Sequence, residues 1–278
     1  MNWLFRIIAT LVIVIAVIYP FYEQIEKMEA DTSREATVTT GLPAVYVSPA
    51  TTTTDLPDFA SIRDITERKK TFFAYLLPAI HEENQRIEEQ RVHLRRIQEK
   101  QRLGKTLTNR EKEWLNEMAN FYRVEETQRK GQIADLLNRA DIIPDTLILI
   151  QAANESGWGT SRFATDALNF FGQWCWTQGC GLVPAARPDG QVYEVRTFES
   201  MEASVRSYIR NLNTHFAYSD LRGIRSELRA NNDDISSTYL TQGLLSYSER
   251  GEEYIEELNQ MIRINRPIIL EVQEEIDS

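Results

Sequence analysis

The chain has 278 residues, of which 42% are hydrophobic, and a formal net charge of −10. This length and composition suffice for one large or two small packed domains. Because phosphate binding requires a basic surface, the charge argues against nucleic acid as a partner. It also gives no help in attracting an anionic polymer.

The sequence contains none of the short patterns that hold common cofactors. Its histidines, His81, His93 and His215, do not have the spacing of metal ligands. A phosphate-binding loop, a dinucleotide-binding glycine pattern and a nucleophile elbow are all missing from the sequence. We therefore predict neither a metal nor an organic cofactor.

Residues 1–22 resemble an export segment. Residues Ile7 to Tyr19 are apolar apart from Thr10, and Arg6 supplies the positive charge in front. No convincing cleavage site follows, which favours an uncleaved membrane anchor over a cleaved signal peptide; a buried helix is the third interpretation. Export predicts a bacterial protein on the inner membrane facing the periplasm, or one free in the periplasm if the segment is cleaved.

A linker and a charged helical region are expected next. Residues 23–58 are polar and contain several prolines, which is typical of a flexible linker. From Ile62 to Leu103 apolar residues recur at helical spacing among many charges, and Pro78 can kink or divide this helix. A capping box at Thr108 predicts the next helix. We assign residues 59–131 to a charged N-terminal extension.

Residues 132–266 form the predicted main domain. A helix through the apolar run Leu147–Ile150 should be buried nearly all round and should end near Glu155. Burial raises the pKa of a carboxyl group, and a glutamate that stays protonated near neutral pH can act as a general acid. The alternative is a structural acid that caps a helix or pairs with Arg162.

The segment after this helix has a different character. Residues 169–198 are rich in glycine, proline and aromatic residues, and the alternation over residues 192–196 predicts a short strand in a small hairpin. Helix resumes after an N-cap at Ser200. Residues 267–278 read as an acidic, frayed tail.

Aromatic residues gather in the same region. Trp158, Trp174 and Trp176 follow Glu155 closely, and Phe171 lies between them. Apolar faces of pyranose rings stack on aromatic side chains, so these residues are candidates for a sugar-binding groove. A local aromatic core is the alternative, and we favour it for Phe171.

Cys175 and Cys180 are the only cysteines of the chain. Two residues at this spacing are too few for a tetrahedral zinc site. In an exported domain a disulfide is the natural interpretation, and two free thiols are the alternative.

Two motifs resemble a known family. The segment Ala153–Gly159, followed by residues 169–172, resembles the glucosaminidase domain of glycoside hydrolase family 73, which has an A-x-x-E-S-G-W-G motif and then N-L-F-G. Phe170 replaces the leucine here. The cysteine pair and residues 141–144, 208–215 and 217–218 also resemble members of this family, and the likeness extends from about Ile62 to Ile264.

The resemblance implies a mostly α (α+β), lysozyme-like fold in which a small β lobe forms one wall of a groove. It implies an endo-β-N-acetylglucosaminidase that cleaves the β-1,4 bond between N-acetylglucosamine and N-acetylmuramic acid in peptidoglycan strands. Glu155 matches the general acid of the family. Residues 244–248 and Tyr254 resemble its late G-Y-A-T…Y segment, so Tyr247 matches the active-site tyrosine, although Ser246 replaces the usual glycine. The substrate-contact candidates are Trp158, Asn169, Phe171, Trp174, Trp176 and Tyr254.

The second carboxylate of a glycosidase is not clearly matched. Glu194 and Asp189 lie in the region where many members of the family place an acid, but neither falls in a clear motif. The acetamido group of the substrate could assist as nucleophile instead. We favour Glu155 as the acid, name Glu194 as the candidate partner, and leave the second role open.

Three other functions compete with this interpretation. Lytic transglycosylases of lysozyme-like fold also use a Glu-Ser pair, but they usually carry a G-L-M-Q-type motif, whereas this chain has Asn169–Gly172. A zinc amidase is disfavoured because the histidines are scattered. An anchored peptidoglycan-binding scaffold with a degenerate site fits the unmatched second acid, but the intact motif around Glu155 opposes it.

Overall fold

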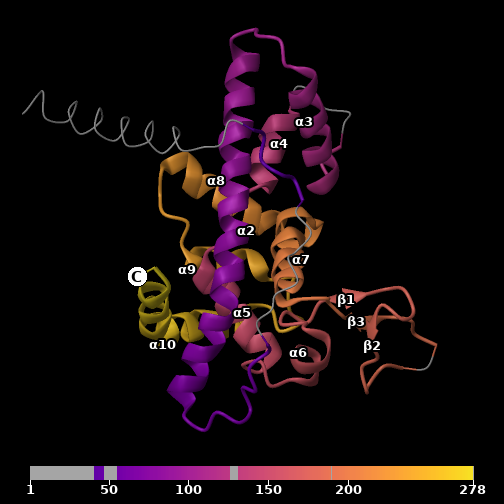
Figure 1. Ribbon diagram of the computed structural model, residues 1–278, viewed down its shortest axis with the longest axis vertical. Coiled ribbons are helices and arrows are strands. Elements are labelled where there is room, and N and C mark those ends of the chain that lie inside the picture. Colours follow the sequence, from indigo (N-terminus) through magenta and orange to yellow (C-terminus); the bar gives the residue numbers. More distant parts are fainter. Residues whose placement is uncertain (1–40, 47–54, 126–130, 189, 278) are drawn as a thin grey trace, which may run out of the picture. The chain divides into compact units, whose positions relative to one another are not determined.

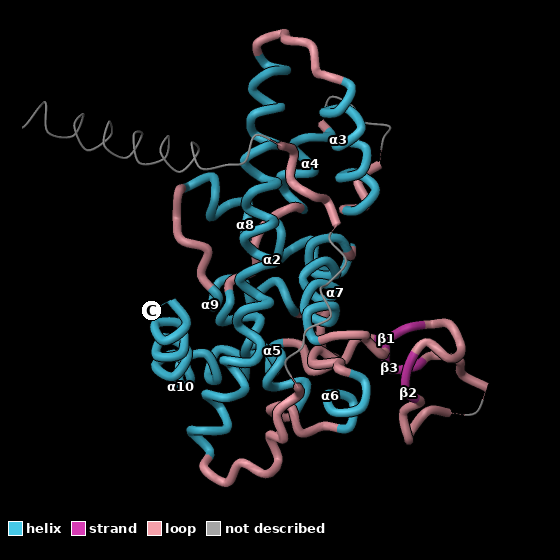
Figure 2. Tube along the Cα trace, in the orientation of Figure 1, coloured by secondary structure: helices cyan, strands magenta, loops and turns pink. Residues whose placement is uncertain are grey.

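The computed structural model describes residues 41–46, 55–125, 131–188 and 190–277. Within these residues the chain is mostly helical with one small antiparallel sheet, as the sequence predicts (Figures 1 and 2). The predicted N-terminal anchor or signal peptide, residues 1–22, lies outside them, and no helix in the described part has the length and apolar character needed to cross a membrane. Residues 43–278 form one compact unit.

The long helix α2 (Ile65–Arg102) is the central element of this unit. Asp64 caps its first turn by accepting a hydrogen bond from the backbone N–H of Glu67 (2.8 Å). The helix continues through Pro78 without a break. Its fully buried apolar face packs against three helices of the predicted main domain, α5 (Asp145–Ser156), α7 (Met201–Thr214) and α10 (Glu252–Asp277). This face consists of Phe72, Phe73, Leu76, Leu77 and Ile80.

This packing joins the predicted extension to the main domain. Helix α2, which lies in the predicted extension of residues 59–131, shares one hydrophobic core with residues of the predicted main domain. Charged residues of α2 also take part in the packing, because the buried Glu83 forms ion pairs with Arg86 of the same helix and with Arg206 of α7. The two predicted regions are therefore packed together.

Shorter helices surround α2. The capping box predicted at Thr108 is present, with hydrogen bonds in both directions between Thr108 and Glu111, and it begins α3. Ser200 is the N-cap of α7, also as predicted. The remaining helices are α3 (Asn109–Phe121), α4 (Gln132–Arg139), α5 (Asp145–Ser156), α6 (Arg162–Ala167), α7 (Met201–Thr214), η1 (Phe216–Tyr218), α8 (Ser219–Asn231), α9 (Ser237–Leu240), η2 (Thr241–Leu244) and α10 (Glu252–Asp277).

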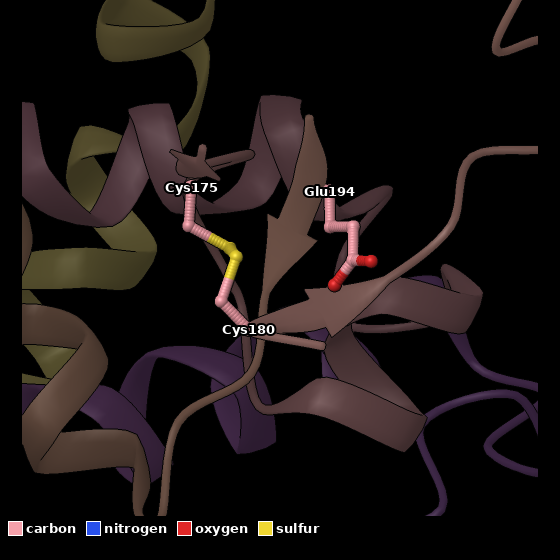
Figure 3. A group of neighbouring side chains, drawn as sticks. All are labelled: Cys175, Cys180 and Glu194. Carbon is pink, nitrogen blue, oxygen red and sulfur yellow. A yellow bond between two sulfur atoms is a disulfide. The ribbon is translucent and has the colours of Figure 1, made fainter. Parts of the chain in front are cut away.

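The sheet has three very short strands, β1 (Trp174–Cys175), β2 (Gly181–Leu182) and β3 (Glu194–Arg196). The strand predicted over residues 192–196 is present as β3. It lies in the centre of the order β1-β3-β2 and pairs antiparallel with both neighbours, so the lobe is a three-stranded sheet instead of a simple hairpin. Cys175 and Cys180 form the predicted disulfide (Figure 3).

Two segments differ from their predicted character. Part of the predicted linker packs on α2 and α3, because the carbonyl of Pro43 accepts a hydrogen bond from Trp114 and that of Val45 accepts one from Arg86. The predicted acidic tail continues α10 to Asp277, because Ile269 and Val272 are buried against the core.

Candidate active site

A cleft of about 570 Å³ lies where the β lobe, the end of α5 and the helices α7 and η1 meet. Its wall includes Glu155 from α5, the aromatic residues Trp174, Trp176 and Tyr247, and several polar side chains of α7. Glu155 is the single carboxylate among the described residues of this wall. The cleft therefore contains one candidate acid and a set of exposed aromatic rings.

The position of Glu155 follows from the local sequence. Residues 147–150 are fully buried, so α5 is surrounded by the core and its last turn reaches the cleft from inside. Gly157 ends the helix in the left-handed conformation (φ 58°, ψ 48°), and its N–H bonds to the carbonyl of Ala153. Glycine adopts this conformation without a steric penalty, which explains why α5 ends directly after the acid.

Burial dominates the electrostatics of Glu155. Removal from water raises the pKa of its carboxyl group above the usual range. The hydroxyl of Tyr254 donates to Oε1 at 2.9 Å, and this bond and a longer one from Asn154 oppose the effect by stabilising the charged form. The desolvation effect is larger, so Glu155 keeps its proton to a higher pH than an exposed glutamate does.

A buried hydrogen-bonded chain holds this acid in place. Gln151 donates from Nε2 to the hydroxyl of Tyr254 at 2.9 Å, and its Oε1 accepts from Tyr208. Gln151 and Glu155 are one helical turn apart on the same face of α5. No site role is predicted from the sequence for Gln151 or Tyr208. The sequence does offer one signal for Gln151, because a glutamine directly after an apolar run should be buried, and a buried polar side chain requires hydrogen-bond partners.

Tyr254 has a different place from the one expected. We predicted a substrate contact, but only 2% of its surface is exposed and it does not line the cleft. Its hydroxyl bonds link α10 to the acid. We therefore assign Tyr254 as a positioning residue for Glu155.

Tyr247, the residue matched to the family's tyrosine, does line the cleft. Its hydroxyl donates to the backbone carbonyl of Phe171 (2.9 Å), and its ring stacks parallel to that of Tyr254 with 5.6 Å between centroids. Burial and the neighbouring acidic groups raise the pKa of Tyr247 well above its usual value. The hydroxyl therefore stays protonated at ordinary pH, and the catalytic role of Tyr247 stays a prediction.

The predicted aromatic residues separate into two groups. Trp174 and Trp176 lie at the cleft with 50% and 72% of their surfaces exposed, as a sugar-binding role requires. Phe171 also borders the cleft, but its ring is buried and stacks on Tyr208 at 4.0 Å. Its ring therefore belongs to the aromatic core, the alternative that we favoured, and a contact of Phe171 with substrate stays a prediction.

Trp158 and Asn169 do not line the cleft. The ring of Trp158 packs against Phe72 and Phe73 of α2, with centroid distances of 5.8 and 5.5 Å. The buried amide of Asn169 donates to the carbonyls of Gln173 and Arg196, both at 2.8 Å, and so ties the loop before β1 to β3. These contacts give both residues a structural task.

Glu194 also has structural contacts. Its buried carboxylate accepts hydrogen bonds from the backbone N–H groups of Gly179 (3.0 Å) and Gly181 (2.8 Å), which lowers its pKa. Figure 3 shows it beside the disulfide. Glu194 is not among the residues that line the cleft. The proposed catalytic role of Glu194 stays a prediction, and Asp189 lies outside the described residues. Both neighbouring sulfur atoms are bonded to each other, so this cluster offers no thiolate for a metal.

Two comparisons with known proteins found a match. The family model "Glucosaminidase: Mannosyl-glycoprotein endo-beta-N-acetylglucosaminidase" matches residues 130–266. Protein bax of Escherichia coli (strain K12) is 35% identical over 216 residues, which cover 77% of this chain and 76% of that protein. No solved structure matches significantly. The likeness to lysozyme therefore stays a prediction.

Proposed function

Since this chain belongs to the glucosaminidase family, we propose that it hydrolyses the β-1,4 bond between N-acetylglucosamine and N-acetylmuramic acid in peptidoglycan. The family supports a glycosidase. The peptidoglycan substrate is supported by the resemblance of the two motifs and by the predicted export segment, which would place the enzyme beside the cell wall. Anchoring in the inner membrane is part of the proposal.

The observation that carries the proposal is the setting of Glu155. It is the one carboxylate that the described cleft wall offers, and burial raises its pKa. A protonated carboxyl group can donate its proton to the glycosidic oxygen as the bond breaks, which is the general-acid step of glycoside hydrolysis. Trp174 and Trp176 are positioned to stack on the sugar rings beside it.

The group that acts opposite Glu155 is the second part of the mechanism. Because the carboxylate of Glu194 is occupied by two backbone N–H groups, it is poorly placed to attack the sugar. We therefore favour the acetamido group of the substrate, whose carbonyl oxygen would attack the anomeric carbon while Glu155 protonates the leaving oxygen. Water would then open the resulting ring and restore the proton of Glu155.

Mass spectrometry of digested peptidoglycan tests the activity. Fragments with a reducing N-acetylglucosamine end are expected. An anhydro-muramic end would indicate a transglycosylase, and the absence of fragments would indicate a binding scaffold. A mannosyl-glycoprotein, the substrate that the family's description names, is tested in the same assay, and cleavage of it alone would contradict the proposal.

Substitution of the acid tests the assignment of Glu155. Glu155→Gln removes the transferable proton at nearly constant shape, so the rate should fall by about 10²-fold or more while the thermal midpoint stays close to that of the parent chain. Glu256→Gln is the matched control, because Glu256 is exposed on α10 and outside the cleft wall. A Glu155→Gln variant that cleaves at the parent rate would refute the assignment.

A further inference from the structure

Three arginines line the same cleft as Glu155. Arg123 comes from the end of α3, Arg196 from β3 and Arg210 from α7. Within the described residues, none of the three forms an ion pair with a carboxylate, although the chain as a whole carries a net charge of −10. The wall of the cleft is therefore locally positive on an acidic protein.

Arg210 is the fixed member of this group. Its Nε donates to the carbonyl of Phe121 at 3.0 Å, and its guanidinium lies over the Phe121 ring at 4.7 Å. This single hydrogen bond uses only Nε, so the other N–H groups of the Arg210 guanidinium can bind a further partner. Burial and the positive charges of Arg123 and Arg196 lower the pKa of Arg210, so both neighbours repel its charge.

Arg123 occupies a backbone position that favours glycine. It follows α3 with φ 55°, and the N–H of Val124 bonds back to the carbonyl of Ala119 (2.8 Å), the arrangement in which glycine usually occupies this position. An arginine adopts the left-handed conformation only at an energetic penalty. Backbone strain of this kind accumulates at functional sites, and here the side chain belongs to the cleft wall.

We propose that Arg123, Arg196 and Arg210 form a carboxylate-binding subsite of the cleft. The inference rests on the proposed function: the ligand is a carboxylate on the muramic acid side of the scissile bond. It is either the lactyl carboxylate of N-acetylmuramic acid or a carboxylate of the peptide attached to it. Guanidinium forks bind carboxylates in a bidentate manner, and a positively charged, partly enclosed cleft concentrates anions.

This subsite would give the enzyme two features. It would orient the strand, because only one of the two alternating sugars carries the acidic substituent. It would also provide local attraction for an anionic polymer that the net charge of the protein repels. Both effects should weaken as salt is added, since exposed charges are screened.

The test measures binding by calorimetry with the full-length Glu155→Gln variant, so that no probe is cleaved. The three probes are a short glucosaminyl-muramic acid oligosaccharide with free lactyl carboxylates, its neutral methylamide, and the same sugars carrying the peptide. The parent should bind at least one carboxylate probe about tenfold or more tightly than the methylamide. A preference for the first probe assigns the lactyl group, and a preference for the third alone assigns the peptide.

Variants then connect the preference to the arginines. Arg123→Gln combined with Arg196→Gln changes two exposed side chains and should bring the ratio of affinities for the carboxylate probe and the methylamide close to one. Arg210→Lys keeps the charge but loses the planar fork, so it should lower this ratio only partly. Arg266→Gln, exposed on α10 and outside the cleft wall, should leave it unchanged. Thermal midpoints identify any variant that fails to fold.

Equal binding of the three probes, or equal weakening of all three in the double variant, would overturn the subsite. These outcomes do not depend on cleavage. Failure of the proposed function would instead appear as the absence of fragments when the wild-type chain is incubated with peptidoglycan.

Discussion

Gly159 makes the closest backbone contact in the motif that follows Glu155. It adopts φ 76°, and a Cβ built on it would lie 2.3 Å from Cδ2 of Phe59. Phe59 is 1% exposed and packs edge-on against Phe72 of α2 with 5.4 Å between centroids, so its ring has no free space to enter. Gly159→Ala should therefore strain the backbone and also displace a buried ring.

Gly157 in the same motif provides the matched control. It has a similar left-handed φ of 58°, but the nearest atom to a built Cβ is Oγ1 of Thr160 at 3.5 Å, an ordinary contact. The left-handed penalty of about 1–2 kcal/mol applies to alanine at either position. Overpacking at Gly159 adds about 1–3 kcal/mol. Gly159→Ala should thus lower the free energy of unfolding by about 2–5 kcal/mol, and Gly157→Ala by the backbone penalty alone.

Urea unfolding followed by circular dichroism measures both losses in one series, and a constant m-value would show that they reflect stability. The contact with Phe59 predicts a larger loss of stability for Gly159→Ala than for Gly157→Ala. If Gly157→Ala and Gly159→Ala destabilise the protein equally, the contact with Phe59 contributes nothing. A Gly159→Ala chain as stable as the parent would also refute the left-handed penalty.

Three further predictions concern the acid and the β lobe. Tyr254→Phe removes a hydrogen bond that stabilises the ionised form of Glu155, so the pKa of Glu155 should rise. Because a general acid must be protonated, the alkaline limb of the pH–rate profile should move to higher pH; a shift to lower pH would contradict the role of Tyr254. Glu194→Gln should leave the rate of glycan cleavage nearly unchanged but should make residues 176–193 more sensitive to proteolysis. A slower glycan cleavage with unchanged sensitivity to proteolysis would instead indicate that Glu194 is catalytic. Replacing both Cys175 and Cys180 by serine should lower the free energy of unfolding by about 2 kcal/mol, because the closed loop is short, and calorimetry would show an unchanged melting temperature if the disulfide were irrelevant.

The sequence predicts those features of the site that depend on neighbouring residues. The apolar run before Glu155 and Gly157 after it are enough to place a carboxyl group at the end of a buried helix. Burial there raises the pKa of the Glu155 carboxyl group. Trp174 and Trp176 were expected at a groove because a short glycine-rich lobe cannot bury two large rings. The disulfide follows from a cysteine pair in an exported chain.

Features that depend on distant parts of the chain could not be predicted in this way. Trp158 was expected in the groove because the periodicity around it does not reveal that α2 crosses directly behind it. Tyr254 is 99 residues from Glu155 in sequence, and only the packing of α10 brings its hydroxyl to the acid. The three arginines of the cleft come from three separate elements, so no local pattern groups them.

The path of α2 has a practical consequence for anyone who wishes to produce a fragment of this protein. The family model begins at residue 130, yet Trp158, which lies between the two glycines of the first motif, packs against Phe72 and Phe73 of α2. A recombinant piece trimmed to residues 130–266 would lack α2 and would expose to water the core residues that α2 covers. The compact unit begins at Pro43, so a fragment that is meant to fold should keep residues 43–129 as well.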